Sequence, residues 1–192
     1  MPAADAGSGR HPAPPSLTGE VDPDGLIWKQ GDFRRDPWRP SPTGGEPGAA
    51  PLLLDKPRWL AERETLSSRS APVGLCLVGG ERVDDIADDL TRFALITLSF
   101  AKFSDGRAFS TARLLREKFG YGGELRAVGN VLSDQIPFMR RVGFDAFEVN
   151  HAPTRCALRE GRIAEVRLYY QPVGPAPGPG TRTWLRGSSA SG

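Results

Sequence analysis

The 192-residue sequence has few residues of the kind that build metal or disulfide sites, since it contains two Cys and two His. Two thiols cannot form a disulfide framework, a four-thiolate zinc site or a protein-bound iron–sulfur cluster. No run of about 18 apolar residues is present, which argues against a transmembrane helix, and the first residues hold no apolar signal segment. The net charge of +2 is too small for a nucleic-acid footprint. We therefore expect a cytoplasmic protein, in a reduced compartment, that binds neither membrane nor nucleic acid.

The common phosphate and nucleophile motifs are also missing. The sequence contains no G-x-G-x-x-G, no G-x-x-x-x-G-K-[ST] and no G-x-S-x-G. Gly79-Gly80 does follow an apolar run, but Glu81 comes next and brings a negative charge to the place where a pyrophosphate would bind. We expect no dinucleotide, no other cofactor and no metal site.

Glycine and proline are abundant, at 23 and 18 residues, and they concentrate at the two ends. Residues 1–24 and 173–192 have almost nothing to bury, which predicts disordered tails. Residues 25–172 then form a single α/β domain. Within it the patterns predict a β-hairpin at 26–38, a linker at 40–50 and a parallel βα core at 52–150. A C-terminal helix follows at about 154–170, where residues 162–169 also suit an edge strand.

Four apolar runs in the core predict strands, at 73–78, 95–100, 124–128 and 146–149. Helical patterns separate them, so the fold class is α/β, with a small, mostly parallel sheet of about four strands in βαβ units and helices on its faces. Asp55 is the expected N-cap of a helix that reaches about Ser68. Ser133 is the expected cap of the helix that carries Ile136 and Met139. A short helix near residues 83–90 is expected to turn its acidic side outward: Asp84, Asp85, Asp88 and Asp89.

Ligands of open parallel sheets bind beyond the carboxyl ends of the strands. Two helix N-termini, near Arg107 and Ser133, open there and offer free N–H groups to an anion. The binding candidates at this edge are Lys102, Asp105, Arg107, Arg126, Asn130, Asp134 and Gln135. The simpler interpretation has Asp105 capping the helix, Arg107 in a surface ion pair, and Asp134 and Gln135 complementing the helix dipole. No catalytic residue is assigned.

Three further features have a structural and a functional interpretation. Arg113 and Arg116 lie on one side of a helix, as a solvated face or as an interaction surface for an acidic partner. His151 is the one histidine in the predicted domain, and no second His or Cys stands near it in the sequence. Cys76 sits within an apolar strand and is expected to behave as a small apolar residue.

The most distinctive segment of the sequence lies between residues 101 and 148. It contains DGR at 105–107, ARLLRE at 112–117, ELRAVG at 124–129 and GFDAFE at 143–148, and RWLAER precedes it at 58–63. Over about residues 26–172 the chain resembles the bacterial family catalogued as domain of unknown function 934. Asn130 stands where that family usually has Asp, which argues against an essential carboxylate at this position.

That resemblance implies a gene located near the sulfite reductase gene, and members are often labelled probable oxidoreductases involved in sulfite reduction. It supplies no reaction, cofactor or catalytic residue to carry over. It implies an accessory protein of assimilatory sulfite reduction, within sulfate assimilation, whose partner is sulfite reductase or its electron donor. The alternative is a small α/β enzyme or sensor that binds sulfite, sulfate or a phosphorylated metabolite at the carboxyl edge of the sheet.

Overall fold

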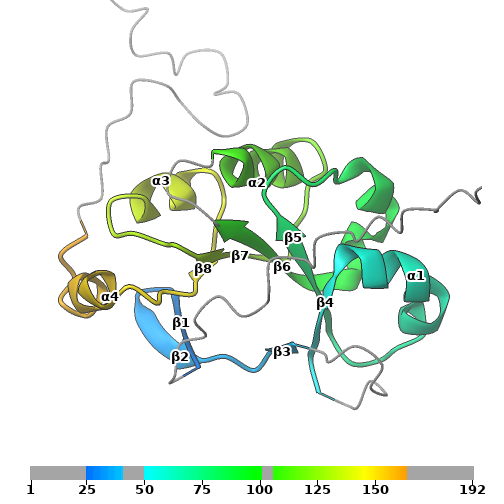
Figure 1. Ribbon diagram of the computed structural model, residues 1–192, viewed down its shortest axis with the longest axis horizontal. Helices are drawn as coiled ribbons and strands as arrows, with labels where there is room; N and C mark the ends of the chain where they lie inside the picture. Colours follow the sequence, from blue (N-terminus) through cyan, green and yellow to red (C-terminus); the bar gives the residue numbers. More distant parts are fainter. Residues whose placement is uncertain (1–24, 41–49, 101–105, 164–192) are drawn as a thin grey trace, which may run out of the picture.

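The computed structural model describes residues 25–40, 50–100 and 106–163 (Figure 1). Its strands are β1 (Leu26–Lys29), β2 (Asp32–Arg35), β3 (Arg39–Pro40), β4 (Leu52–Asp55), β5 (Val73–Val78), β6 (Phe93–Phe100), β7 (Glu124–Gly129) and β8 (Ala146–Phe147). Its helices are α1 (Lys56–Ser67), the 3-10 helix η1 (Asp84–Arg92), α2 (Arg107–Glu117), α3 (Ile136–Arg141) and α4 (Ala152–Arg159). The predicted tails and most of the predicted linker lie outside these ranges.

All of these strands join one sheet in the order β2-β1-β8-β7-β6-β5-β4-β3. Strands β3 to β8 are parallel, and the hairpin β1–β2 adds to β8 in the antiparallel sense. The predicted α/β class with a mostly parallel sheet is confirmed. The sheet has more strands than the predicted four or so, because the hairpin strands β1 and β2 join it at one end and β4 and the two-residue β3 extend it at the other.

Each crossover from β4 to β8 moves one strand in the same direction. Right-handed crossovers of this kind all lie on one side of the sheet, and α1, α2 and α3 share one side in Figure 1. Ring contacts agree, since Trp59 of α1 lies 4.7 Å from Phe93 and Phe109 of α2 lies 5.0 Å from Phe100 (ring centroids). Helices on both faces were expected, but α1, η1, α2 and α3 cover a single face. From β3 to β8 the strand order has no reversal, so the crevice that a reversal opens is not formed between these parallel strands.

Local signals explain the ends of several elements. Gln30 (φ 55°) and Gly31 (φ 87°) are both left-handed, as a two-residue type I′ hairpin turn requires. Asp55 caps α1, because its Oδ1 accepts the N–H of Arg58 at 3.0 Å, and Pro57 lies in the first turn. The predicted hairpin and the predicted cap are both confirmed. None of the described helices has the length and apolar character needed to cross a membrane.

Three local predictions need correction. Helix α3 begins at Ile136 with Gln135 as its N-cap, so Ser133 does not cap it. Asp89 does not face outward, because it is buried, accepts the indole N–H of Trp59 at 2.8 Å and pairs with Arg63 at 2.6 Å. Helix α4 begins at Ala152 and ends at Arg159, before Gly161, which has a φ of 65°. Residues 164–170, where the predicted helix continues or an edge strand forms, lie outside the described ranges.

The face of the sheet opposite the helices carries a row of polar side chains. Asp55, Cys76, Thr97 and Arg126 are register partners on β4, β5, β6 and β7, so their side chains share one face. The segment between β2 and β3 lies against this face. A Cβ on Gly74 would stand 2.9 Å from the Trp38 ring, so glycine is what leaves room for that ring. We call Asp55, Cys76, Thr97 and Arg126 the polar row.

Candidate functional site

The carboxyl edge of the sheet holds part of the predicted site. Gly79 packs against the start of α2, since a Cβ there would lie 3.3 Å from the Ala108 backbone nitrogen. Gly80 has a φ of 92°, and a Cβ on it would lie 3.0 Å from Cδ of Arg107. The Arg107 side chain therefore extends over the Gly79-Gly80 turn, beside the N-terminus of α2. This arrangement places a guanidinium and helix N–H groups at one end of β5.

Other predicted residues lie at the same edge but in separate loops. Asn130 is exposed directly after β7, and its backbone N–H donates to the Phe100 carbonyl at 3.0 Å. Asp134 is exposed in the turn before α3, and Gln135 Oε1 accepts the Leu132 N–H at 3.5 Å. Lys102 and Asp105 lie outside the described residues. The structure thus puts Arg107, Asn130, Asp134 and Gln135 beyond the carboxyl ends of their strands.

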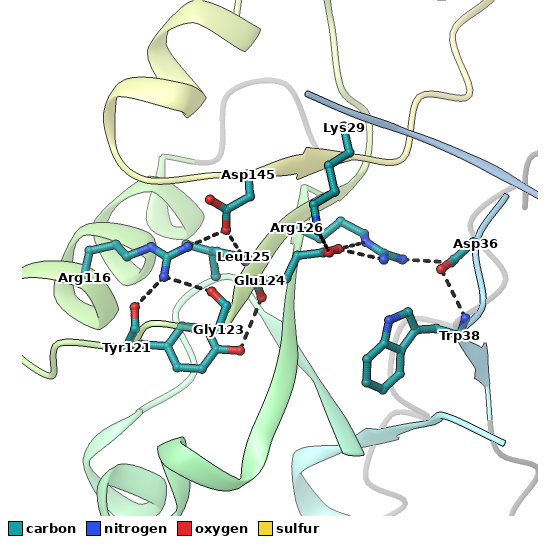
Figure 2. Close-up of polar contacts among 10 residues, drawn as sticks. All are labelled: Lys29, Asp36, Trp38, Arg116, Tyr121, Gly123, Glu124, Leu125, Arg126 and Asp145. Atoms are coloured by element: carbon teal, nitrogen blue, oxygen red, sulfur yellow. Dashed lines mark hydrogen bonds and ion pairs between the residues drawn. The ribbon is translucent and has the colours of Figure 1, made fainter. Parts of the chain in front are cut away.

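Arg126 does not belong to that edge. It lies in the middle of β7, three residues before the strand ends, which is about 10 Å from the edge at strand spacing. Its side chain is only 2% exposed and lies on the face opposite the helices. Nη1 donates to Asp36 Oδ2 at 2.8 Å, while Nε and Nη2 donate to Glu124 Oε1 at 3.0 and 2.7 Å (Figure 2). Two carboxylates therefore balance this buried cation.

Lys29 completes the cluster, because its Nζ lies 2.6 Å from Glu124 Oε2. Burial by itself raises the pKa of Glu124, but Arg126 and Lys29 together lower that pKa below its ordinary value. Glu124 and Arg126 stand two apart in a strand, a spacing that puts both on one face and is visible in the sequence. Asp36 is 90 residues away, and no sequence pattern links it to Arg126.

Cys76 lies in the same polar row and is chemically quiet. Desolvation by burial raises the pKa of its thiol to about 11, although the Thr97 hydroxyl donates to the sulfur at 3.1 Å. At neutral pH the thiol stays protonated, whereas nucleophiles and metal ligands are thiolates. Cys76 was expected to behave as a small apolar residue; the structure makes it half-buried, protonated and hydrogen-bonded to Thr97.

The two interaction-surface candidates have different surroundings. Arg113 is exposed and pairs with Glu117 one turn later at 2.8 Å. Arg116 is largely buried and binds the loops before β7 and β8. It donates to the carbonyls of Tyr121 and Gly123 and to Asp145 Oδ2 (Figure 2), and its Nε donates to the Gly143 carbonyl at 3.0 Å. Asp145 in turn accepts the N–H of Leu125 at 2.8 Å. The guanidinium of Arg116 thus ties together two loops at the amino end of the sheet.

His151 precedes α4 and is exposed, with its Nδ1 2.8 Å from the Thr154 hydroxyl. Within residues 25–40, 50–100 and 106–163, no three His, Cys, Asp or Glu side chains gather in a way that could hold a metal ion. The described candidates therefore comprise one cationic edge at Arg107 and one charge-balanced cluster around Arg126.

Comparison with known proteins gives one result. No curated protein matches the chain. A model of a family described as "Bacterial protein of unknown function (DUF934)" matches residues 74–180, which is more than half of the chain. The matched region runs from β5 through α4, so it contains the Gly79-Gly80 turn, Arg107 and Arg126. The chain belongs to this family of bacterial proteins, domain of unknown function 934.

Proposed function

We propose that this chain is an accessory protein of assimilatory sulfite reduction, which acts by binding sulfite reductase, its electron donor or an intermediate. Membership of the family over residues 74–180 is the observation that carries the proposal. Resemblance to this family implies a gene located near that of the sulfite reductase haemoprotein. An accessory role through binding accounts for that gene location without assigning a reaction to this chain.

The geometry supports binding more than chemistry by the described side chains. The Cys76 thiol is protonated at neutral pH, and the Arg126 guanidinium is held by two carboxylates. A site that used either group would first have to break these contacts. The described part instead presents a mostly parallel sheet covered by helices on one face, which suits a scaffold that offers its edges to a partner.

The test uses the full chain and sulfite reductase purified from the same host. We expect the two proteins to associate in sedimentation experiments and the turnover of sulfite to rise when this chain is added at saturating amounts. A carrier protein of similar size serves as the control for crowding. Absence of association together with unchanged turnover would remove the proposal.

The position of Arg107 favours a second candidate, an enzyme or sensor that binds an oxyanion at the carboxyl edge. Its guanidinium extends over Gly80 at the start of α2, and a guanidinium binds oxyanions through two parallel hydrogen bonds. Titration calorimetry with sulfite, sulfate and phosphate should then show binding that weakens about ten-fold in Arg107→Ala. Arg113→Ala is the matched control, since Arg113 lies on the same helix and pairs with Glu117. Equal binding by the two variants would exclude this candidate.

A further inference from the structure

Strand β2 lies at one end of the sheet, with β1 on its only neighbouring side in the strand order. Figure 1 shows α4 next to the hairpin β1–β2, at the same end of the molecule. Two guanidiniums of α4, those of Arg155 and Arg159, lie over the ring of Phe33 in β2, at 5.6 and 5.3 Å from its centroid. The edge of the sheet and the helix therefore form one continuous surface.

The pairing pattern fixes which backbone groups of β2 point outward. The N–H of Asp36 donates to the Gly25 carbonyl at 2.9 Å, so residues 25 and 36 form a hydrogen-bonded pair. In an antiparallel ladder hydrogen-bonded and non-hydrogen-bonded pairs alternate, so Leu26↔Arg35 and Trp28↔Phe33 are non-hydrogen-bonded pairs. The backbone N–H and C=O groups of Phe33 and Arg35 therefore face away from β1. Asp32 Oδ1 accepts the outward N–H of Phe33 at 2.8 Å. Within residues 25–40, 50–100 and 106–163, no strand pairs with the Phe33 carbonyl or with the backbone groups of Arg35, so these groups can accept a further strand.

Positive charge surrounds these backbone groups. Arg34 and Arg35 are exposed on β2, and Arg159 is exposed on α4. The four arginines Arg34, Arg35, Arg155 and Arg159 and the neighbouring Asp32 sum to a charge of +3, whereas the whole chain carries +2. Glu160, next to Arg159, pairs with Arg162. We call this surface the basic edge, defined by Phe33, Arg34, Arg35, Arg155 and Arg159.

We propose that the basic edge is a docking surface for an extended acidic segment of another protein, which adds as a strand beside β2. Strand addition satisfies the open backbone groups of Phe33 and Arg35, and acidic side chains on the added strand face the arginines. Charge complementarity selects this partner and raises the rate of encounter. The proposal names the surface through which the accessory role is exerted, and it rests on the proposed function only for the identity of the partner.

The same observations argue against two other occupants. Nucleic acid complements arginine but offers no peptide groups to an edge strand, and Arg34 and Arg35 alternate to opposite faces of β2 rather than forming a single stripe. A second copy of the chain would bring its own basic edge against this one, so like charges would oppose each other. An acidic polypeptide meets both the backbone and the charge requirements.

The experiment uses the full chain and three fluorescent probes: a peptide of alternating Glu and Val, a peptide of alternating Lys and Val, and a single-stranded oligonucleotide. We expect the Glu–Val peptide to bind, to weaken as salt rises, and to bind at least about ten-fold more weakly to Arg35→Glu/Arg159→Glu. Arg113→Glu is the control and should bind as the wild type does. Stronger binding of the oligonucleotide, or equal weakening by the control, would overturn the proposal.

Hydrogen exchange of the wild type keeps the test independent of how the double variant folds. The Arg35 amide should become protected when the Glu–Val peptide is bound, because that N–H joins the added strand; an unprotected Arg35 amide would contradict strand addition. With purified sulfite reductase, association that persists in the double variant would refute this surface and leave the proposed function standing. Peptide binding without any association of the wild type with reductase would support this surface and refute the proposed function. Loss of self-association in the double variant would instead identify a second copy as the occupant and overturn the proposal.

Discussion

Replacing Arg126 by Met tests whether the charged cluster on the face opposite the helices stabilises the fold. The Arg126 side chain is 2% exposed, and its loss removes a cationic partner from Asp36 and Glu124, whose side chains are 18% and 15% exposed. Removing one partner of a buried ion pair costs about 3–5 kcal/mol. We expect the lower end, about 3 kcal/mol, because Glu124 keeps Lys29 and both carboxylates keep some contact with water. In a domain of this size that lowers the melting temperature by about 6–12 °C.

The assay is urea unfolding followed by circular dichroism, at pH 7 and at decreasing pH. Arg126 and Lys29 hold the folded pKa of Glu124 below its ordinary value in spite of burial. The stabilisation from this carboxylate is therefore present above the unfolded pKa of about 4.3 and is lost as the pH falls through the folded pKa. The difference between wild type and Arg126→Met should then narrow in acid. Asp36→Asn/Glu124→Gln/Arg126→Met should recover part of the loss, because it leaves no carboxylate buried without a partner. Lys29 loses Glu124 in this variant, but its side chain is 30% exposed and reaches water.

Arg113→Met provides the matched control, because Arg113 and Glu117 are both exposed and such pairs contribute little. It should change the free energy of unfolding by no more than about 0.5 kcal/mol. A loss below about 1 kcal/mol for Arg126→Met at pH 7, or a loss that stays constant into acid, would refute the reasoning.

Three further predictions concern single groups. Asp55→Ala should cost about 1 kcal/mol in urea unfolding, because the N–H of Arg58 loses its acceptor, and Asp55→Ser should retain most of the stability; equal losses would contradict the cap. Gly129→Ala should destabilise by more than about 1 kcal/mol in the same assay, because Gly129 has a φ of 91° and a Cβ would lie 2.8 Å from the Phe100 carbonyl oxygen. Gly122→Ala is the control, since a Cβ there meets nothing within 4 Å. Iodoacetamide at pH 8 should label exposed Cys156 well before Cys76, whose pKa of about 11 keeps it protonated, and rapid labelling of Cys76 measured by mass spectrometry would contradict its burial.

The structure places only part of the predicted candidate set at the carboxyl edge of the sheet. The difference comes from whether the position of a residue follows from chain order or from tertiary contacts. Arg107, Asn130, Asp134 and Gln135 follow the ends of strands or begin helices, so chain order alone places them at the carboxyl edge. Arg126 was predicted as a binding candidate although it lies within the predicted strand at 124–128. Its direction depends on strand alternation, and its partner Asp36 comes from the segment that lies against the opposite face. The basic edge was missed because Arg34 and Arg159 are far apart in the sequence, and only the pairing of β1 with β8 brings α4 beside β2.

The amino-acid sequence by itself determined the elements whose signals are local. The hairpin within residues 26–38, the cap at Asp55 and the apolar run of β5 each depend on neighbours along the chain, and each was predicted. Only the tertiary structure decided the strand order, the single helical face and the burial of Asp89 and Arg126. The physical reason is that these features arise from contacts between distant segments. Their free energy depends on which strands become neighbours, and no local pattern encodes that choice.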